Sequence, residues 1–389
     1  MPPTPANLIV LLVDGLRASA LGAYGNTTFG TPALDRLAAQ SELCEWCYAD
    51  TPDHETLLGA LWGGAKGESL AAVAHRMGLK SMYVTDDRPA ATIADQCGFG
   101  SVEWIEPASP SRPADSIAGC WQAEFWRACA ERLEHAAPKT PSDTPLMLIA
   151  HTAGLYGAWD APAELVESLV DEEDPPVEVS VDRPDQQADG EDADAAADAR
   201  FAASCRYAAQ VMALDACIEG FLEVVDRLLA GSDATVAIVG LRGFPLGEHG
   251  IIGGVDERLF GEQQHVPVLL RRSGANARGL LRDDKPSTLS DLGASLLASG
   301  VDATAGGVAR LSSPSGAVAI RTDEWYFRHP GGEVGQAGEE VCELYVKPDD
   351  RWEANDIASL RGEVVEDFVE SLASGAAVGP RKASPVEPA

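Results

Sequence analysis

The chain contains 389 residues, and 45% of them are hydrophobic, so it is long and apolar enough to bury the core of one large domain. Its 61 acidic residues outnumber its 29 basic ones and give a formal net charge of −32. This charge repels nucleic acids and anionic membranes, and we therefore expect neither as a partner.

The first predicted element is a strand near the N-terminus. Residues 8–13 are continuously apolar, which is typical of a strand that is buried on both faces of a parallel sheet. The run is too short for the hydrophobic region of a signal peptide, and no stretch approaches the roughly 20 apolar residues of a membrane helix. We therefore expect a cytoplasmic location, where the eight cysteines are mostly reduced.

Strands and helices then alternate along most of the chain. Thr31 and Pro32 are typical of a helix start, and six apolar residues from Val211 to Leu228 recur at the three- and four-residue steps of a long amphipathic helix. The other predicted helices span 33–40, 54–62, 69–77, 118–135 and 288–298, and the predicted strands span 43–49, 80–85, 146–151, 235–239 and 266–270. This alternation predicts an α/β fold with a mostly parallel sheet between helices.

The last part of the chain has a different pattern. Short strands cluster there and a helix follows them, which indicates a small α+β subdomain with an antiparallel sheet. The strands are predicted at 317–321, 325–328 and 342–346, and the helix at 362–374. We therefore divide the chain into an α/β domain at 1–310 and a C-terminal subdomain at 311–389 that ends in a disordered tail. The small residues at 302–316 are expected to be flexible.

An acidic segment interrupts the α/β pattern at residues 167–199. It is dense in Asp, Glu, Pro and Ala and has almost no aromatic or long aliphatic side chains. Such a segment buries too little apolar surface to offset the entropy of ordering it. We therefore predict a mobile insertion.

Two strand ends carry candidate site residues. Ligands of open parallel sheets bind beyond the carboxyl ends of the strands, where Asp14 and the segment 240–243 are expected. An aspartate in this place can be a metal ligand, or it can cap a loop or form a salt bridge. The residues around Asp14 alone leave these alternatives open.

Seven segments, taken in order, resemble signature motifs of the sulfatases in the alkaline phosphatase superfamily. They are VDGLRASALGAYGN (13–26), TPALDRLA (31–38), CYADTP (47–52), LGEHGIIGG (246–254), HVPVLLR (265–271), RTDEWYFR (321–328) and ELYVKPDDRWEANDIA (343–358). These segments extend over almost the whole chain. The resemblance implies the alkaline phosphatase/sulfatase-like α/β fold and an ancestry among sulfuric ester hydrolases.

The metal-binding positions depart from the family pattern. The resemblance implies a divalent cation, usually calcium, held by two carboxylates after the first strand and by Asp with Asn or His after a later one. Here Gly15 follows Asp14, and Leu241-Arg242 stands at the later position. A hard cation takes about six to eight oxygen ligands, so we expect no metal and no other cofactor. The guanidinium of Arg242 could occupy the place of the cation and pair with both Asp14 and Asp50, and we predict a contact between Asp14 and Arg242 that replaces the metal.

The positions that the resemblance assigns to catalysis are also replaced. Asp50 stands at the nucleophile, His54 at the arginine that follows it, Tyr156 at a central histidine, and Gly254 at the lysine that contacts the sulfate. We therefore favour a catalytically inactive family member, a pseudo-sulfatase, that binds an unidentified ligand or protein. An inactive subunit that stabilises an active relative by dimerisation is an alternative.

A further alternative keeps catalysis. Related phosphatases and phosphodiesterases use Thr or Ser as the nucleophile, so Thr51 or Asp50 could serve a hydrolase of sulfate or phosphate esters with a rearranged site. The other candidates for such a site are Asp53, His54, His151 and His249. For His151, at the end of an apolar strand, and for His249, in a fold signature, a structural role is favoured.

Overall fold

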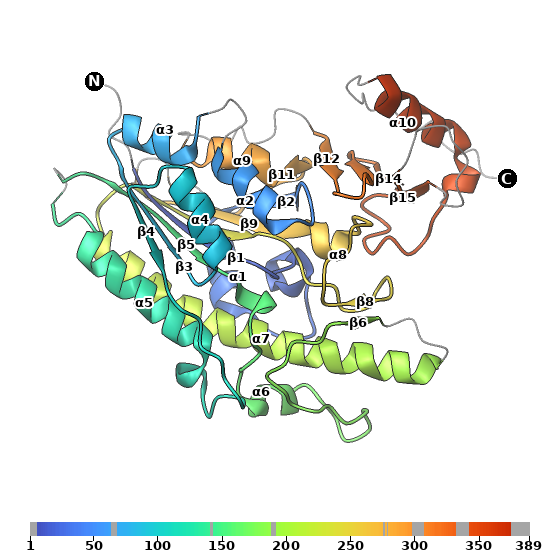
Figure 1. Ribbon diagram of the computed structural model, residues 1–389, viewed down its shortest axis with the longest axis horizontal. Helices are drawn as coiled ribbons and strands as arrows, with labels where there is room; N and C mark the ends of the chain where they lie inside the picture. The colour runs from blue at the N-terminus through green and yellow to red at the C-terminus, as the bar shows by residue number, and fades with distance from the viewer. Residues whose placement is uncertain are drawn as a thin grey trace.

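The computed structural model describes residues 6–63, 68–140, 143–187, 192–274, 277, 279–297, 307–331 and 342–374. A large sheet crosses the main body of the molecule and has helices on both faces (Figure 1). Its strands within the described ranges are β1 (Asn7–Val13), β2 (Glu42–Tyr48), β3 (Lys80–Thr85), β4 (Ser101–Trp104), β5 (Leu146–Thr152), β7 (Ala234–Gly240), β9 (His265–Arg272), β10 (Leu281–Asp283) and β11 (Ser287–Thr288).

The order of these strands is β10-β2-β9-β7-β1-β5-β3-β4, with β11 beside β2. The described pairings are parallel except for the two that β9 makes, with β2 and with β7. The predicted mostly parallel sheet is therefore confirmed.

The side chains of β1 alternate between two cores, one on each face of the sheet. The odd-numbered residues from Ile9 to Val13 belong to a cluster with α1 (Pro32–Ala38), α5 (Trp121–Ala136) and α7 (Ala193–Leu228). The even-numbered residues from Leu8 to Leu12 belong to the opposite cluster, with α2 (His54–Gly63), α3 (Leu70–Arg76), α4 (Arg88–Gln96) and α9 (Leu289–Ser295). Because both faces are covered, β1 is apolar throughout.

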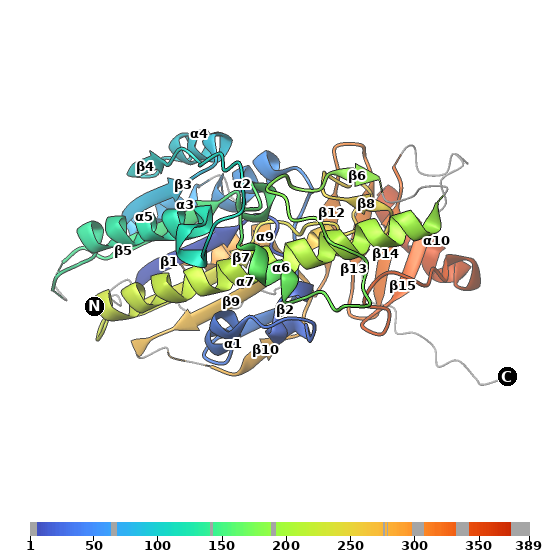
Figure 2. The ribbon, with the colours of Figure 1, turned by 90° about the horizontal axis from the view of Figure 1, so that it is seen from below.

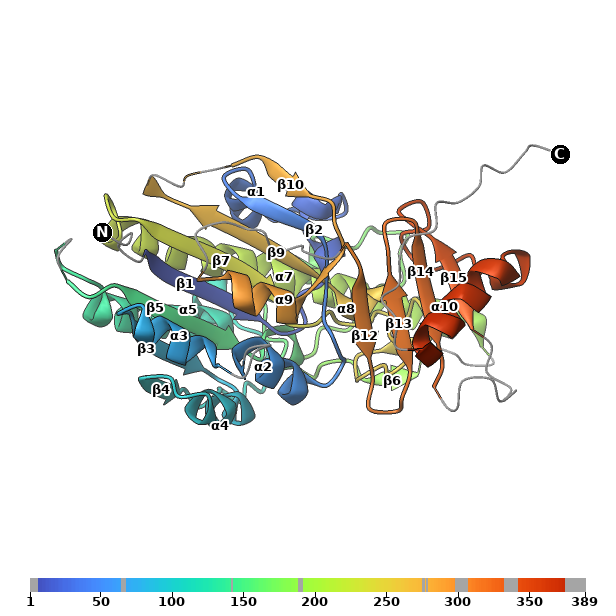
Figure 3. The ribbon, with the colours of Figure 1, turned by 90° about the horizontal axis from the view of Figure 1, so that it is seen from above.

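A smaller unit lies beyond one end of the main sheet (Figure 2 and Figure 3). Its described strands are β12 (Ala309–Ser312), β13 (Val318–Arg321), β14 (Trp325–His329) and β15 (Glu343–Val346), and they form an antiparallel sheet in this order. The helix α10 (Gly362–Ser374) packs on this sheet, with Phe368 stacked on Phe327. The predicted α+β subdomain is confirmed.

Two details of this subdomain differ from the sequence predictions. The strand β12 lies within 302–316, which was expected to be flexible, and the predicted boundary at residue 310 falls inside it. Ala309 and Leu311 are buried while the residue that follows each of them is exposed, an alternation that is too short to stand out in the sequence. The predicted tail at 375–389 lies outside the described residues.

The acidic segment 167–199 contributes to three elements. It holds the end of α6 (Ala163–Glu167), the strand β6 (Gln186–Gln187), which pairs with β8 (Ile251–Ile252), and the start of α7. Val177 and Val179 pack against a small apolar cluster. The side chain of Asp192 caps α7, and the alanines that follow are strong helix formers. Residues 188–191 lie outside the described ranges, and the mobility of the segment stays a prediction.

Two predicted helices also change at their ends. The short 3-10 helix η3 (Ile117–Gly119) precedes α5, which therefore begins at Trp121 rather than at residue 118. Helix α9 begins at Leu289, after its cap Thr288, and ends at Ser295, so it is shorter than the predicted helix at 288–298. No helix in the described parts of the chain is long and apolar enough to span a membrane.

Candidate functional site

The carboxyl ends of the parallel strands meet at one edge of the main sheet, beside the C-terminal subdomain. Asp14 directly follows β1, Asp50 lies two residues after β2, and Arg242 lies two residues after β7. Because β7 is a neighbour of β1, the residues that follow these two strands come together. The stacked rings of Tyr48 and Tyr326 join the end of β2 to β14 in the subdomain.

A buried ion pair joins Asp14 to Arg242, and the predicted contact is thus confirmed. Nε of Arg242 lies 2.9 Å from Oδ1 and 3.2 Å from Oδ2 of Asp14, and Nη2 lies 3.0 Å from Oδ2. Asp14 is 3% exposed and Arg242 is 7% exposed. Nη1 of Arg242 donates to the backbone oxygen of Pro52 at 3.0 Å. The arginine therefore ties together the loops that follow β1, β2 and β7.

The electrostatic setting keeps this arginine charged. Burial by itself lowers the pKa of Arg242, but Asp14, Tyr156 and Asp53 together outweigh the burial, and the pKa is raised. A guanidinium also holds its proton far above neutral pH in water. The pair is therefore a cation and an anion held in contact away from solvent.

The ring of Tyr156, in the 3-10 helix η4 (Gly154–Tyr156), covers the guanidinium. Cζ of Arg242 lies 4.0 Å from the ring centroid, within the range of a cation–π contact. The hydroxyl lies 3.0 Å from the oxygen of Gly243 and 3.2 Å from that of Gly254, and Nε2 of Gln263, in α8 (Gly261–Gln264), donates to it at 2.9 Å. Burial raises the pKa of Tyr156 to about 12, so the phenol is neutral near pH 7.

These residues do not fit the divalent cation that the sequence resemblance implies. Both carboxylate oxygens of Asp14 accept from Arg242, and the buried Leu241 has no side-chain ligand atom. Gly15 has a φ of +84°, and a Cβ on it would lie 2.7 Å from Cβ of Leu155. Among the described residues, no three His, Cys, Asp or Glu side chains are arranged to hold a metal ion. We therefore assign no chemical step at this site to a metal.

No family model and no curated protein matches the sequence. The structure is similar to the phosphonate monoester hydrolase of Agrobacterium radiobacter, at 15% identity with 95% of each chain covered and a TM-score of 0.72. It is also similar to a 2-O GAG sulfatase, at 14% identity with 95% of this chain and 92% of that chain covered and a TM-score of 0.63. A protein in the alkaline phosphatase superfamily from Vibrio parahaemolyticus is similar at 14% identity, with 95% of this chain and 89% of that chain covered and a TM-score of 0.56. The chain has the sulfatase fold. The fold expected from the seven motifs is thereby confirmed.

In this sulfatase-fold chain, Asp50 is not paired with Arg242. Oδ2 of Asp50 accepts the N–H of Ser290 at 3.0 Å, at the start of α9, and burial raises the pKa of Asp50. Arg242 therefore makes the predicted contact with Asp14 but not the second pairing, with Asp50, that its guanidinium could have made. The free N–H groups at the N-terminus of α9 provide the carboxylate with a different partner.

Thr51, the other candidate nucleophile, is buried in the same loop. Its Oγ1 accepts the N–H of Asp53 at 3.4 Å, and Asp53 in turn accepts the N–H of Thr56 at the start of α2. A threonine nucleophile needs a base or a metal that takes its proton. The described contact of the Thr51 hydroxyl is with a donor, so it does not activate this residue.

Two histidines lie close enough to the ion pair to interact with Asp14 electrostatically. Nε2 of His54, at the start of α2, lies 3.6 Å from Oδ2 of Asp87, and this carboxylate raises the pKa of His54. Nδ1 of His151, at the end of β5, lies 2.9 Å from Oγ1 of Thr85. Burial lowers the pKa of His151, so it is a neutral core histidine at pH 7.

His54→Gln is expected to change how stability depends on pH. Because the folded-state pKa of His54 is raised above its ordinary value of 6.5, the pair with Asp87 stabilises the fold fully below that pH and loses its effect as pH rises through the raised pKa. Because the pair is partly exposed, the free energy of unfolding of the wild type should exceed that of the variant by at most about 1 kcal/mol in acid. In alkali the two free energies should be equal. Thermal unfolding of the wild type and the variant between about pH 6 and pH 9 measures this difference, and a substitution at an exposed histidine, His75→Gln, is the control. A difference between wild type and His54→Gln that stays constant across this pH range would contradict the prediction.

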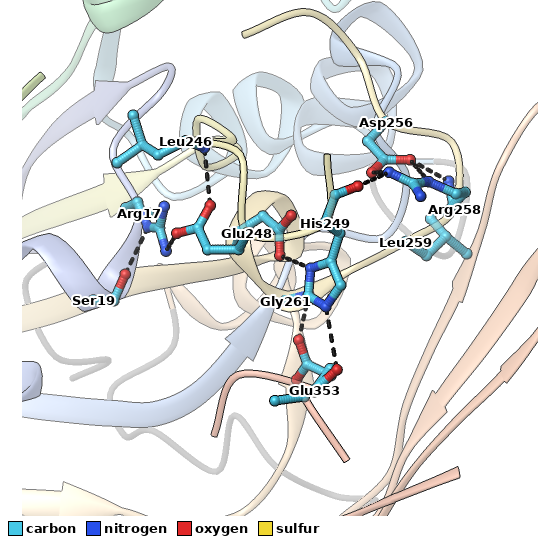
Figure 4. Close-up of polar contacts among 12 residues, drawn as sticks. Arg17, Ser19, Leu246, Glu248, His249, Asp256, Arg258, Leu259, Gly261 and Glu353 are labelled. Atoms are coloured by element: carbon cyan, nitrogen blue, oxygen red, sulfur yellow. Dashed lines mark hydrogen bonds and ion pairs between the residues drawn. The ribbon is translucent and has the colours of Figure 1, made fainter. Parts of the chain in front are cut away.

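His249 has the structural role that its motif predicted. Nδ1 of His249 lies 2.7 Å from Oε2 of Glu262, and Nε2 lies 3.2 Å from the backbone oxygen of Glu353 in the C-terminal subdomain (Figure 4). Beside it, Arg17 forms an ion pair with Glu248 at 2.5 Å. These contacts join the loop at 246–254 to the segment after β1, to α8 and to the subdomain.

The sequence analysis did not single out Asp86 and Asp87, which follow β3 at the same edge of the sheet. Asp86 accepts hydrogen bonds from Nε1 of Trp121 at 2.9 Å, from Oγ1 of Thr152 at 2.8 Å and from the N–H of Ala153 at 2.7 Å. The signal was available, because Asp86 directly follows a predicted strand, as Asp14 does.

Proposed function

We propose that this chain is a catalytically inactive sulfatase-fold protein that acts by binding a ligand or a protein partner. The observation that carries the proposal is the guanidinium of Arg242, which contacts both carboxylate oxygens of Asp14 and lies against the ring of Tyr156. A charged guanidinium repels a divalent cation from the place where Asp14 would offer a ligand. Hydrolysis of a sulfate or phosphate ester at this place would then lack the metal that assists it.

The other replaced positions support the same proposal. Asp50 binds the start of α9, His54 faces Asp87, and Gly254 has no side chain that could contact an anion. The net charge of −32 disfavours polyanionic partners, so the proposed ligand or protein surface is neutral or cationic. A cytoplasmic location belongs to this proposal and can be tested by cell fractionation.

The full chain is expected to contain no stoichiometric metal and to unfold at the same temperature in calcium, in zinc and in chelator. A ligand raises the unfolding temperature only if it binds the folded state in preference to the unfolded chain. Elemental analysis and thermal unfolding measure the two quantities, and assays with aryl sulfates, phosphate monoesters and diesters should show no turnover. Bound metal together with a lower unfolding temperature in chelator would overturn the proposal.

Two outcomes of the same assays would support the alternatives. Turnover that is lost in Thr51→Ala or in Asp50→Asn would establish a hydrolase with a rearranged site. Co-purification with an active sulfatase-fold enzyme, and loss of that enzyme's stability when this chain is absent, would instead indicate an inactive partner subunit.

A further inference from the structure

Two thiols from distant parts of the sequence meet between α5 and α7. Sγ of Cys120 lies 4.0 Å from Sγ of Cys217, although the residues are 97 positions apart. Cys120 immediately precedes α5, Cys217 lies in α7, and both belong to the core cluster in which these helices pack. The cysteines are 2% and 9% exposed, and Cys120 directly follows the exposed residues Ala118 and Gly119 of η3.

The surroundings favour the thiolate of Cys120. A hydrogen bond with Cys217 lowers the pKa of Cys120, and two backbone N–H groups in the first turn of the 16-residue helix α5 act in the same direction. The carboxylate of Asp160 opposes ionisation of both thiols, and Arg127 favours that of Cys217. A nucleophilic thiol beside a second thiol is the arrangement that thiol–disulfide exchange requires.

We infer that Cys120 and Cys217 form a redox-sensitive pair, which a low-molecular-weight disulfide such as oxidised glutathione converts into an intramolecular disulfide. The Cys120 thiolate attacks one sulfur of the small disulfide, and the first small thiol leaves. Cys217 then gives up its proton and attacks Sγ of Cys120, and the second small thiol leaves. The two protein sulfurs lose two electrons, the small disulfide gains them, and both protons end on the small thiols.

The geometry permits this bond with a small movement. The sulfur atoms must approach from 4.0 Å to about 2.05 Å, which rotation of the two side chains and a slight shift of the end of α5 can supply. Cys120 lies at the junction of η3 and α5, so it is outside the regular hydrogen bonding of a helix interior. The inference does not depend on the proposed function.

The disulfide would also restrain contacts beside the candidate site. The backbone N–H of Trp121, next to Cys120, donates to Asp160 at 2.8 Å, and its indole N–H donates to Asp86 at 2.9 Å. Asp86 accepts the N–H of Ala153, in the loop that leads to Tyr156. A bond between α5 and α7 would therefore restrain the contacts that place this loop.

The test uses the full chain, first reduced and then exposed to oxidised glutathione, with free thiols alkylated before digestion and mass spectrometry. We expect a linked peptide pair that contains Cys120 and Cys217, and alkylation of two fewer of the eight thiols. The unfolding temperature should rise by roughly 5 °C, because the bond closes a long loop in the unfolded chain. Reduction should reverse both changes.

Cysteine variants provide the controls. Cys120→Ser and Cys217→Ser should each abolish the link and the temperature rise, whereas Cys97→Ser and Cys342→Ser, at half-buried cysteines elsewhere, should retain both. Circular dichroism under reducing conditions shows whether each variant is folded. If a serine variant does not fold, Cys217→Ala, which also removes one of the two thiols, is tested in its place. Glutathione that stays on Cys120 without the second bond, or links confined to other cysteines, would overturn the inference.

Discussion

Replacement of Arg242 by alanine is expected to lower the free energy of unfolding by about 3–5 kcal/mol, because Asp14 would be left buried without its counter-charge. In the wild type, three contacts of 2.9 to 3.2 Å from the guanidinium satisfy the carboxylate. The variant also loses the hydrogen bond to Pro52 and the contact with Tyr156, so three loops become less tightly joined. Denaturant unfolding followed by tryptophan fluorescence measures the change.

Two comparisons separate the ion pair from a general loss of packing. Asp14→Asn combined with Arg242→Leu removes both charges, so the double variant should recover most of the lost stability. Arg112→Ala breaks an exposed ion pair with Asp115, in which the arginine side chain is 70% exposed, and should change stability much less than Arg242→Ala does. A loss at Arg242 no larger than that at Arg112 would contradict the prediction. Recovery of Arg242→Ala in calcium would show that Asp14 still accepts a cation.

The contact between Asp14 and Arg242 could be predicted because the resemblance to sulfatases implies that both residues stand at ligand positions of one metal site. Both residues follow apolar strands, and β1 and β7 are parallel neighbours. The partner of Asp50 could not be predicted in the same way. It depends on where α9 begins relative to the end of β2, and Ser290 is 240 positions away in the sequence. Hydrophobic periodicity locates elements but does not set the distance between a helix end and a distant loop.

The burial of each element determines which parts of the fold could be predicted from the sequence. The strands β1, β5 and β7 are apolar on both faces, so their sequence signal is strong. The strand β12 buries only two of its four residues and was missed. The first turns of α7 were assigned to the acidic insertion, because aspartates among the alanines hid a sequence of high helix propensity.

Replacement of Gly15 by alanine is expected to destabilise the fold through two separate effects. The φ of +84° lies in the left-handed region, which costs a residue with a Cβ about 1–2 kcal/mol. The new Cβ would lie 2.7 Å from Cβ of Leu155 and 3.2 Å from its backbone carbons, and overpacking of this kind adds about 1–3 kcal/mol. The free energy of unfolding, measured with denaturant, should fall by the sum of these effects.

Gly98→Ala is a matched control, because Gly98 has a φ of +82° and its Cβ would meet nothing within 4 Å. The difference between the two variants therefore measures the contact with Leu155, and equal losses would show that Leu155 moves aside. An aspartate at position 15 needs the same Cβ, so Gly15→Asp is expected to lower stability without a calcium-dependent rise in unfolding temperature. These results would support the proposal that backbone geometry prevents a second carboxylate beside Asp14 and that the charge of Arg242 repels a cation there. Restoring a metal site would require both obstacles to be removed together.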